Sequence, residues 1–216
     1  MSNIINTSES NENTLEGVFK TVLDKFKQSM NIRLPCVVLN VNKDKNSVNV
    51  LPLIKIILAN SENIQRAQIF NVPIQHLSAG GFIIHMPVKV GDFGYIRSCD
   101  RDISLFKQSF SESIPNTKRK ITFEDSIFIP DTINYNNYTI DSEDDNNLVL
   151  QSFDNSVKIS LGSDNINIKA PTINIIGNVN IEGNVSTTGT LENNNVNVGS
   201  THVHIETNGH PTSVPQ

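Results

Sequence analysis

The sequence predicts a mainly β protein with one N-terminal helix, a small barrel and a long, slender C-terminal leg. Three observations support this fold class. The 216 residues are only 37% hydrophobic and 6% aromatic, which is lean for a compact globule of this length. Short apolar runs separated by turn residues fill the first part of the chain, and a two-residue alternation fills the last part.

The helical stretch lies near the N-terminus, so residues 1–30 are predicted to be a polar N-terminus followed by an amphipathic helix. Asn13 and Glu16 have the spacing of a capping pair. The apolar stripe is expected to pack on the chain's own domain, with docking to a partner protein as the alternative. The residues of this stripe are Leu15, Val18, Phe19, Val22, Leu23, Phe26 and Met30.

Residues 31–130 have the pattern of a small β domain. Strands are predicted over residues 36–41, 47–57 and 68–74, with a hairpin turn at residues 43–46. Further strands are predicted over 82–86, after a break at residues 79–81, and over 93–98, with a short helix over 103–109. About five strands in this length predict a barrel of the OB type.

Residues 131–147 are polar and acidic, with Asp141, Glu143, Asp144 and Asp145 close together. Such a run is usually solvated, so it is interpreted as a linker or outer loop. No apolar segment surrounds these carboxylates to raise a pKa, which argues against a glycosidase pair.

Residues 148–205 alternate apolar and polar side chains, which places the apolar set on one face of an extended chain. One narrow strand buries too little apolar surface to form a core, so we expect three copies to wind into an intertwined triple-stranded β-helix. Within residues 174–205 the apolar parity changes once, after residues 193–195. Glycines such as Gly177, Gly183 and Gly189 punctuate the alternation and suit tight corners or crowding at a shared axis.

His202 and His204 continue the apolar parity and are the candidate metal ligands. If three chains meet along this face, six imidazoles surround one ion, which describes octahedral coordination. Zinc prefers four ligands, so iron or nickel is expected instead. The alternative is a pair of exposed histidines on a frayed terminus. Glu206 has the same parity, His210 lies off the pattern and is given no ligand role, and residues 206–216 are assigned to an apex tail.

Composition and motifs argue against several other classes. A net charge of −5 disfavours a general nucleic-acid binder. Cys36 and Cys99 stand in apolar runs and are expected to be buried free thiols. No serine has a nucleophile-elbow motif, and no enzymatic activity is expected. His76 and His85 lack a metal-ligand spacing and are expected to be structural.

The N-terminus lacks the basic and apolar regions of a signal peptide. No apolar run reaches the roughly 20 residues that span a membrane. Synthesis and assembly in the host cytoplasm are therefore expected.

Several segments, in order, resemble the central-spike proteins of phage contractile-tail baseplates. These are residues 80–82 (GGF), 87–92 (PVKVGD), 100–106 (DRDISLF) and 119–130 (RKITFEDSIFIP), followed by the terminal His-x-His. The resemblance covers about residue 33 to the C-terminus. It implies an OB domain, a triple-stranded β-helix and an iron-bearing apex that pierces the host cell envelope.

The resemblance also implies a place in the virion or a phage-like particle, at the tip of the tail baseplate. The helix and the OB domain would hold a homotrimer, with one iron per trimer, on baseplate hub or tail tube proteins. Some relatives carry a lysozyme domain between barrel and β-helix, for which this chain has no room.

Two rival functions remain open from the sequence. A receptor-binding tail fibre or adhesin would need sugar-binding patches on a larger tip domain, and the chain ends soon after the histidines. A nucleic-acid-binding OB module would need a basic groove with stacking aromatic residues. Arg97, Arg101 and Lys107 are scattered instead.

Overall fold

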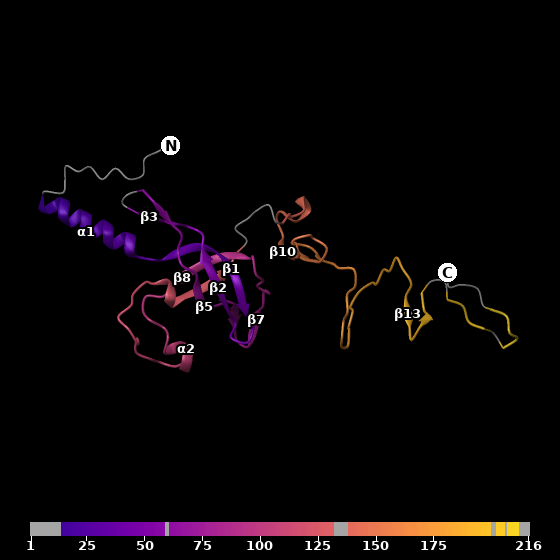
Figure 1. Ribbon diagram of the computed structural model, residues 1–216. Helices are drawn as coiled ribbons and strands as arrows, with labels where there is room; N and C mark the ends of the chain where they lie inside the picture. Colours follow the sequence, from indigo (N-terminus) through magenta and orange to yellow (C-terminus); the bar gives the residue numbers. More distant parts are fainter. Residues whose placement is uncertain (1–13, 59–60, 132–137, 200–201, 206, 212–216) are drawn as a thin grey trace. The chain divides into compact units, whose positions relative to one another are not determined.

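The computed structural model describes residues 14–58, 61–131, 138–199, 202–205 and 207–211 (Figure 1). The chain divides into two compact units, residues 1–169 and 170–216, which are described separately. The described residues are mainly β, as predicted. Among them, no helix combines the length and apolar character needed to cross a bilayer.

Helix α1 (Leu15–Ser29) begins one residue later than the predicted capping pair implies. Thr14 is the N-cap, and its Oγ1 accepts a hydrogen bond of 3.0 Å from the backbone N–H of Gly17. Asn13 lies outside the described residues. The apolar stripe does not pack on its own domain, because Val18, Phe19 and Val22 are each about half exposed or more. That packing prediction is therefore wrong for this chain, and docking to a partner stays a prediction.

Five strands form one antiparallel sheet in the order β5-β2-β1-β8-β9. The predicted turn at residues 43–46 is confirmed: Asn42 pairs with Ser47 across it, and Asn46 has the left-handed φ of 47° that this hairpin uses. The strands are β1 (Arg33–Asn42), β2 (Ser47–Pro52), β5 (Ile69–Pro73), β8 (Phe93–Ser98) and β9 (Ser126–Pro130).

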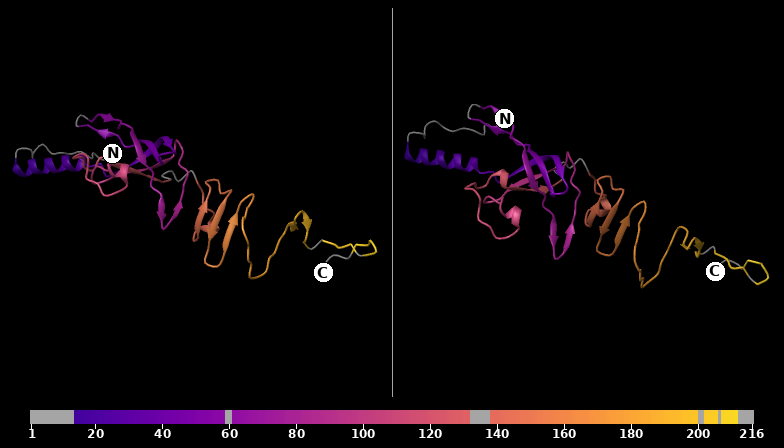
Figure 2. Two further views of the ribbon diagram at one scale, coloured as in Figure 1. Left: turned by 90° about the horizontal axis from the view of Figure 1, so that it is seen from below. Right: turned by 60° about the horizontal axis from the view of Figure 1, so that its bottom comes forward.

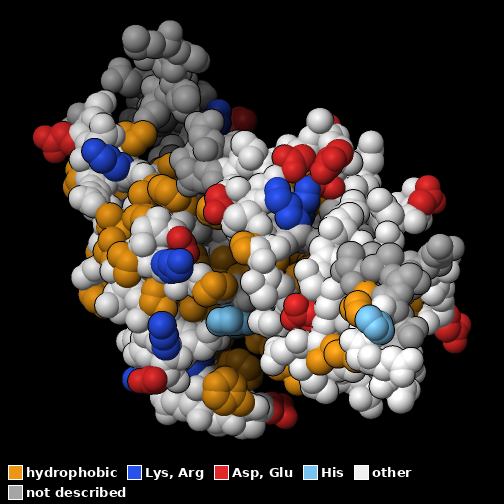
Figure 3. Space-filling view, turned by 90° about the vertical axis from the view of Figure 1, so that its right-hand side faces the viewer, with side chains coloured by type: hydrophobic (Ala, Val, Ile, Leu, Met, Phe, Trp, Pro, Cys, Tyr) orange, Lys and Arg blue, Asp and Glu red, His pale blue; other side chains and the backbone are white. Residues whose placement is uncertain are grey.

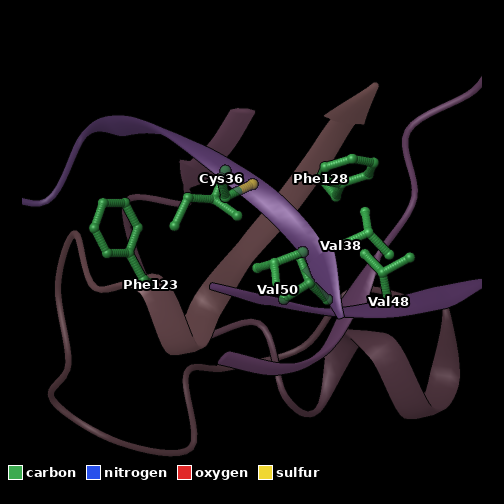
Figure 4. Close-up of a cluster of buried hydrophobic side chains, with 8 residues drawn as sticks. Cys36, Val38, Val48, Val50, Phe123 and Phe128 are labelled. Carbon is green, nitrogen blue, oxygen red and sulfur yellow. The ribbon is translucent and has the colours of Figure 1, made fainter. Parts of the chain in front are cut away.

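The sheet curls into a half-barrel whose two edge strands meet. Ile74, next to β5, forms a parallel bridge with Phe128 of β9, and the Gln75 N–H donates a 2.8 Å hydrogen bond to the Phe128 carbonyl. The core lies inside this curl, as the sticks in Figure 4 show. Its buried side chains are Cys36, Val38, Val48, Val50, Val72, Ile96, Phe123 and Phe128.

Some predicted elements are shorter than expected. The strand predicted over 47–57 ends at Pro52, and β3 (Ile56–Ile57) pairs separately with β4 (Asn63–Ile64). The break at residues 79–81 is a turn between β6 (Leu77–Ala79) and β7 (Phe82–Ile84), where Gly80 and Gly81 have φ values of 59° and 85°. The short helix is α2 (Phe106–Ser109), and η2 (Phe123–Asp125) is a single 3-10 turn before β9.

A second sheet follows the half-barrel in the chain. It contains β10 (Leu148–Gln151), β11 (Lys158–Leu161) and β12 (Ile166–Lys169), all antiparallel and side by side (Figure 2). The 3-10 turn η4 (Ser142–Asp144) precedes it.

The described residues of the unit from residue 170 onward contain little regular structure within one chain. All of residues 171–190 are described, and none of them forms a helix or strand. Beyond them, β13 (Glu192–Asn193) pairs with β14 (Val196–Asn197). Asn194 and Asn195 form the turn with φ values of 51° and 63°. The single parity change predicted after residues 193–195 thus falls at a hairpin.

Candidate functional site

The two candidate ligands of the apex lie together. The rings of His202 and His204 have centroids 5.2 Å apart and are nearly perpendicular, at 87°. The Nδ1 atom of His202 lies 2.6 Å from the carbonyl oxygen of Gly199. A carbonyl only accepts hydrogen bonds, so Nδ1 must carry the proton and the Nε2 lone pair is left to bind an ion.

The ring separation suits coordination of one ion by both imidazoles. A metal about 2.1 Å from each nitrogen places two ring centroids roughly 5 Å apart at a tetrahedral angle, and slightly closer at a right angle. The observed 5.2 Å is near this range. After His204 the chain reverses, because Ile205 forms an antiparallel bridge with Pro211. Glu206 lies outside the described residues, and His210 is exposed.

One face of the β10–β12 sheet is apolar and exposed. Its six aliphatic side chains are paired in register across the strands: Leu148 with Leu161, Leu150 with Ile159, Ile159 with Ile168, and Leu161 with Ile166. We call them the aliphatic ladder. Their exposed fractions range from 38% for Leu161 to 66% for Ile166. The predicted alternation is therefore present, but in a single chain its apolar face is not buried.

The following leg is exposed along its whole length. Every residue from 171 to 190 is exposed, including apolar residues at alternating positions. Ile175, Val179, Ile181 and Val185 each keep more than half of their surface exposed, and Ile176 is fully exposed. Hydrophobic side chains are also widespread on the face shown in Figure 3.

The opposite face of β11 buries a charged cluster that the sequence does not reveal. The Lys158 ammonium binds the carboxylate of Asp144 and lies 3.0 Å from Asp141 Oδ2 and 3.4 Å from Glu143 Oε1. The Ser160 hydroxyl also donates to Asp144. Lys158, Ser160 and Asp144 are all less than 5% exposed. The interpretation of residues 131–147 as solvated is therefore wrong at Asp144.

These contacts explain the electrostatics of the cluster. Hydrogen bonds from Lys158 and Ser160 lower the pKa of Asp144 to about 2, and the carboxylates raise the pKa of Lys158 well above its usual value. Oxygens of Asp141, Glu143 and Asp144 lie within 4.8 Å of one another, a grouping that could bind a cation. The Lys158 ammonium already contacts all three carboxylates and offsets one of their negative charges, so we interpret the cluster as structural.

A second ion-pair network fastens the long loop before β9. Arg119 binds Asp125 through Nε at 3.0 Å and Asp102 through Nη2 at 3.3 Å, and Thr117 donates to Asp102 at 2.6 Å. Asp102 and Asp125 are buried. The hydrogen bonds from Ser104 and Thr117 hold the pKa of Asp102 well below its usual range. Asp102, Arg119 and Asp125 fall within the segments that carry the spike resemblance, where they serve the fold.

His76 and His85, which the sequence treats separately, are neighbours. Their positions directly precede β6 and follow β7, so the hairpin brings the rings to a centroid distance of 5.4 Å. His76 Nε2 lies 2.9 Å from Asn46 Oδ1. The pairing register of the β6–β7 hairpin could have predicted that these two histidines are neighbours. Their spacing in the sequence could not.

The cysteines agree partly with expectation. Both are free, and burial raises the pKa of the Cys36 thiol to about 12. Cys99 is only half-buried. Its pKa is also raised, mainly by burial.

Comparison with known families gives a match over part of the chain. Residues 34–131 match the family described as phage protein Gp138 N-terminal domain. No curated protein matches the chain significantly. The matched residues contain all of the half-barrel except Arg33, the first residue of β1, and they include the loop that Arg119 holds. The match therefore indicates a structural phage protein of the tail or baseplate, associated with the virion.

Proposed function

We propose that this chain forms a homotrimeric central spike at the tip of a contractile-tail baseplate. Sheath contraction would drive the spike through the host cell envelope. The protein would act mechanically and not as an enzyme. The observation that carries the proposal is the exposed, alternating leg of residues 171–190, which ends twelve residues before the first of two neighbouring imidazoles.

The leg needs partners that one chain does not supply. Its apolar side chains remain in water, and each such side chain gains about 1.5–3 kcal/mol when it is fully buried. An extended backbone also needs partners for its N–H and carbonyl groups. Winding three identical legs around one axis supplies both, and it closes the strands so that no sheet edge is left.

The aliphatic ladder supports the same assembly. Three stacked strands with an apolar face gain stability when that face packs on another sheet. Because the leg follows the ladder directly in sequence, we propose that the apolar side chains of both are buried in the same trimer. The intertwined β-helix is thus proposed for residues 148–205.

The half-barrel supports an OB-type domain in residues 31–130. Five strands with a partly open closure are typical of the OB fold. The similarity to the Gp138 N-terminal domain covers the same residues and supports a tail or baseplate setting. We propose that this domain and the exposed stripe of α1 hold the spike on baseplate hub or tail tube proteins.

The apex residues fit a metal ion. His202 and His204 would bind it, and three chains would provide the six nitrogen ligands that favour iron over zinc. The ion would supply no redox chemistry here; it would join three chain termini at one point. The Gly199 carbonyl would fix the tautomer of His202.

The mass of the purified full chain in solution tests the assembly. Sedimentation equilibrium should give three times the 23.9 kDa of one chain. The trimer should persist on dilution, because intertwined chains cannot separate without unfolding. A monomer at micromolar concentration would contradict the proposal.

A further inference from the structure

We infer that His76 and His85 form a second transition-metal site, within one chain and separate from the apex. The site would take a borderline or soft cation, with Cu(II) bound more tightly than Zn(II). It lies where the β6–β7 hairpin meets the turn between β1 and β2. Nothing in the proposed spike function requires it.

The tautomer of His76 leaves a nitrogen available for an ion. Asn46 Oδ1 accepts a hydrogen bond from His76 Nε2, with the atoms 2.9 Å apart. An amide oxygen only accepts, so Nε2 carries the ring proton and Nδ1 keeps its lone pair. That Nδ1 atom is buried and has no hydrogen-bond partner. A buried, unpaired acceptor is costly, and a cation would satisfy it.

The second imidazole is at the right distance. The 5.4 Å between the two ring centroids matches the roughly 5 Å expected when two nitrogens bind one ion at a tetrahedral angle with bonds of about 2.1 Å. The rings are tilted by 36° rather than stacked flat. Asn46 holds the His76 ring through a hydrogen bond. Metal-binding histidines are commonly oriented by a polar group in this way.

The surroundings leave room for the ion and its remaining ligands. A cavity of about 260 Å³ is lined by both histidines, by Asn46 and by Met86. A thioether beside two imidazoles favours copper, which also leads the affinity order of divalent first-row metals. Lys43 lines the same cavity, but its side chain is exposed, so its ammonium can stay in solvent.

Copper titration of the full chain tests this site. Cu(II) binding followed by electron paramagnetic resonance should show one ion per chain with nitrogen hyperfine structure, and copper should raise the melting temperature. The His76→Ala and His85→Ala variants should each lose this ion while keeping the wild-type circular dichroism spectrum. His210→Ala should bind copper as wild type does. Unchanged copper binding in His76→Ala would overturn the inference.

Substitutions at Asn46 separate a metal site from a structural pair. Asn46→Gly suits the φ of 47° but removes the acceptor, so copper affinity should fall by about 10- to 100-fold. Asn46→Asp keeps an acceptor and should bind at least as tightly as wild type. Equal affinity in all three chains would contradict the assigned tautomer and the site.

Stoichiometry and mutation distinguish the His76/His85 site from the proposed apex site. The apex holds one ion per three chains in the proposed spike, whereas this site holds one per chain. The titration is therefore repeated in a His202→Ala/His204→Ala chain, which should still bind one copper per chain through His76 and His85. A chain that is monomeric both as wild type and as this variant would count against the spike and leave this site standing.

Discussion

Lys158 is an unusual choice for a strand position, because its ammonium is buried among side chains of its own unit. The contacts with Asp141, Glu143 and Asp144 explain how the charge is tolerated. A buried pair is weak support for stability overall, but removing one partner leaves the other charge uncompensated. The cluster thus fixes η4 against β11 at the start of the proposed β-helix.

The lowered pKa of Asp144 makes the contact between η4 and β11 sensitive to acid. The folded value of about 2 lies below the ordinary 3.8, so the carboxylate contributes stability that is present above pH 3.8 and is lost as the pH falls through 2. Asp144→Asn should lower the melting temperature at pH 7 and flatten its decline between pH 4 and 2. Circular dichroism melts measure this, with exposed Asp145→Asn as the control. Equal acid sensitivity in wild type and Asp144→Asn would refute the linkage.

Gly94 in β8 is required by close packing rather than by its backbone conformation. A Cβ atom there would lie 2.5 Å from both the Ile129 carbonyl oxygen and the ring of buried Phe128. Gly94→Ala should therefore destabilise the half-barrel by about 1–3 kcal/mol through overpacking. Urea unfolding gives this value, and Arg97→Ala, at an exposed position of the same strand, should cost much less. If Gly94→Ala leaves the free energy of unfolding unchanged, strands β8 and β9 are not in this register.

At the scale of elements, the aliphatic ladder distinguishes folding of one chain from assembly. Leu150 and Ile159 are directly paired and already exposed in the single chain. Leu150→Asn/Ile159→Asn should leave the half-barrel folded but weaken the trimer, by roughly 1.5–3 kcal/mol for each side chain that the trimer buries. Sedimentation in increasing urea measures the shift toward monomer, and exposed Ser163→Asn is the control. A trimer of unchanged stability would exclude the ladder from the interface.

Helix α1 presents a different surface with a different predicted partner. Phe19→Asp and Val22→Asp place charges on its exposed stripe, at positions that do not support the half-barrel core. The variants should fold and trimerise normally but be missing from assembled tails, as immunoblots of purified particles would show. Lys20→Asp, on the polar side of the helix, should be incorporated. Normal incorporation of all three variants would rule out docking through this stripe.

Elements with short-range signals were predictable from the sequence. The turn before Ser47, the strand at Phe93–Ser98 and the parity change near Asn194 each depend on neighbouring residues, and the structure has all three. Helix α1 was predicted too, apart from its cap. Its packing was not, because periodicity identifies an apolar face without saying what covers it.

Contacts between distant residues were not predictable in this way. The Lys158–Asp144 pair spans 14 residues, and the neighbouring His76 and His85 depend on the register of a hairpin. The acidic run was taken for a solvated segment because nothing local shows that a buried lysine would face it. At the apex, spacing alone predicted that His202 and His204 share a side, and their rings do lie together.

At the scale of the whole molecule, the account depends on three chains sharing one ion. Elemental analysis of the purified full chain, combined with its mass in solution, measures this directly. The account predicts a trimer with one iron per three chains, and loss of that iron in His202→Ala/His204→Ala. A monomer without iron, or a trimer whose iron content is unchanged in that variant, would contradict it.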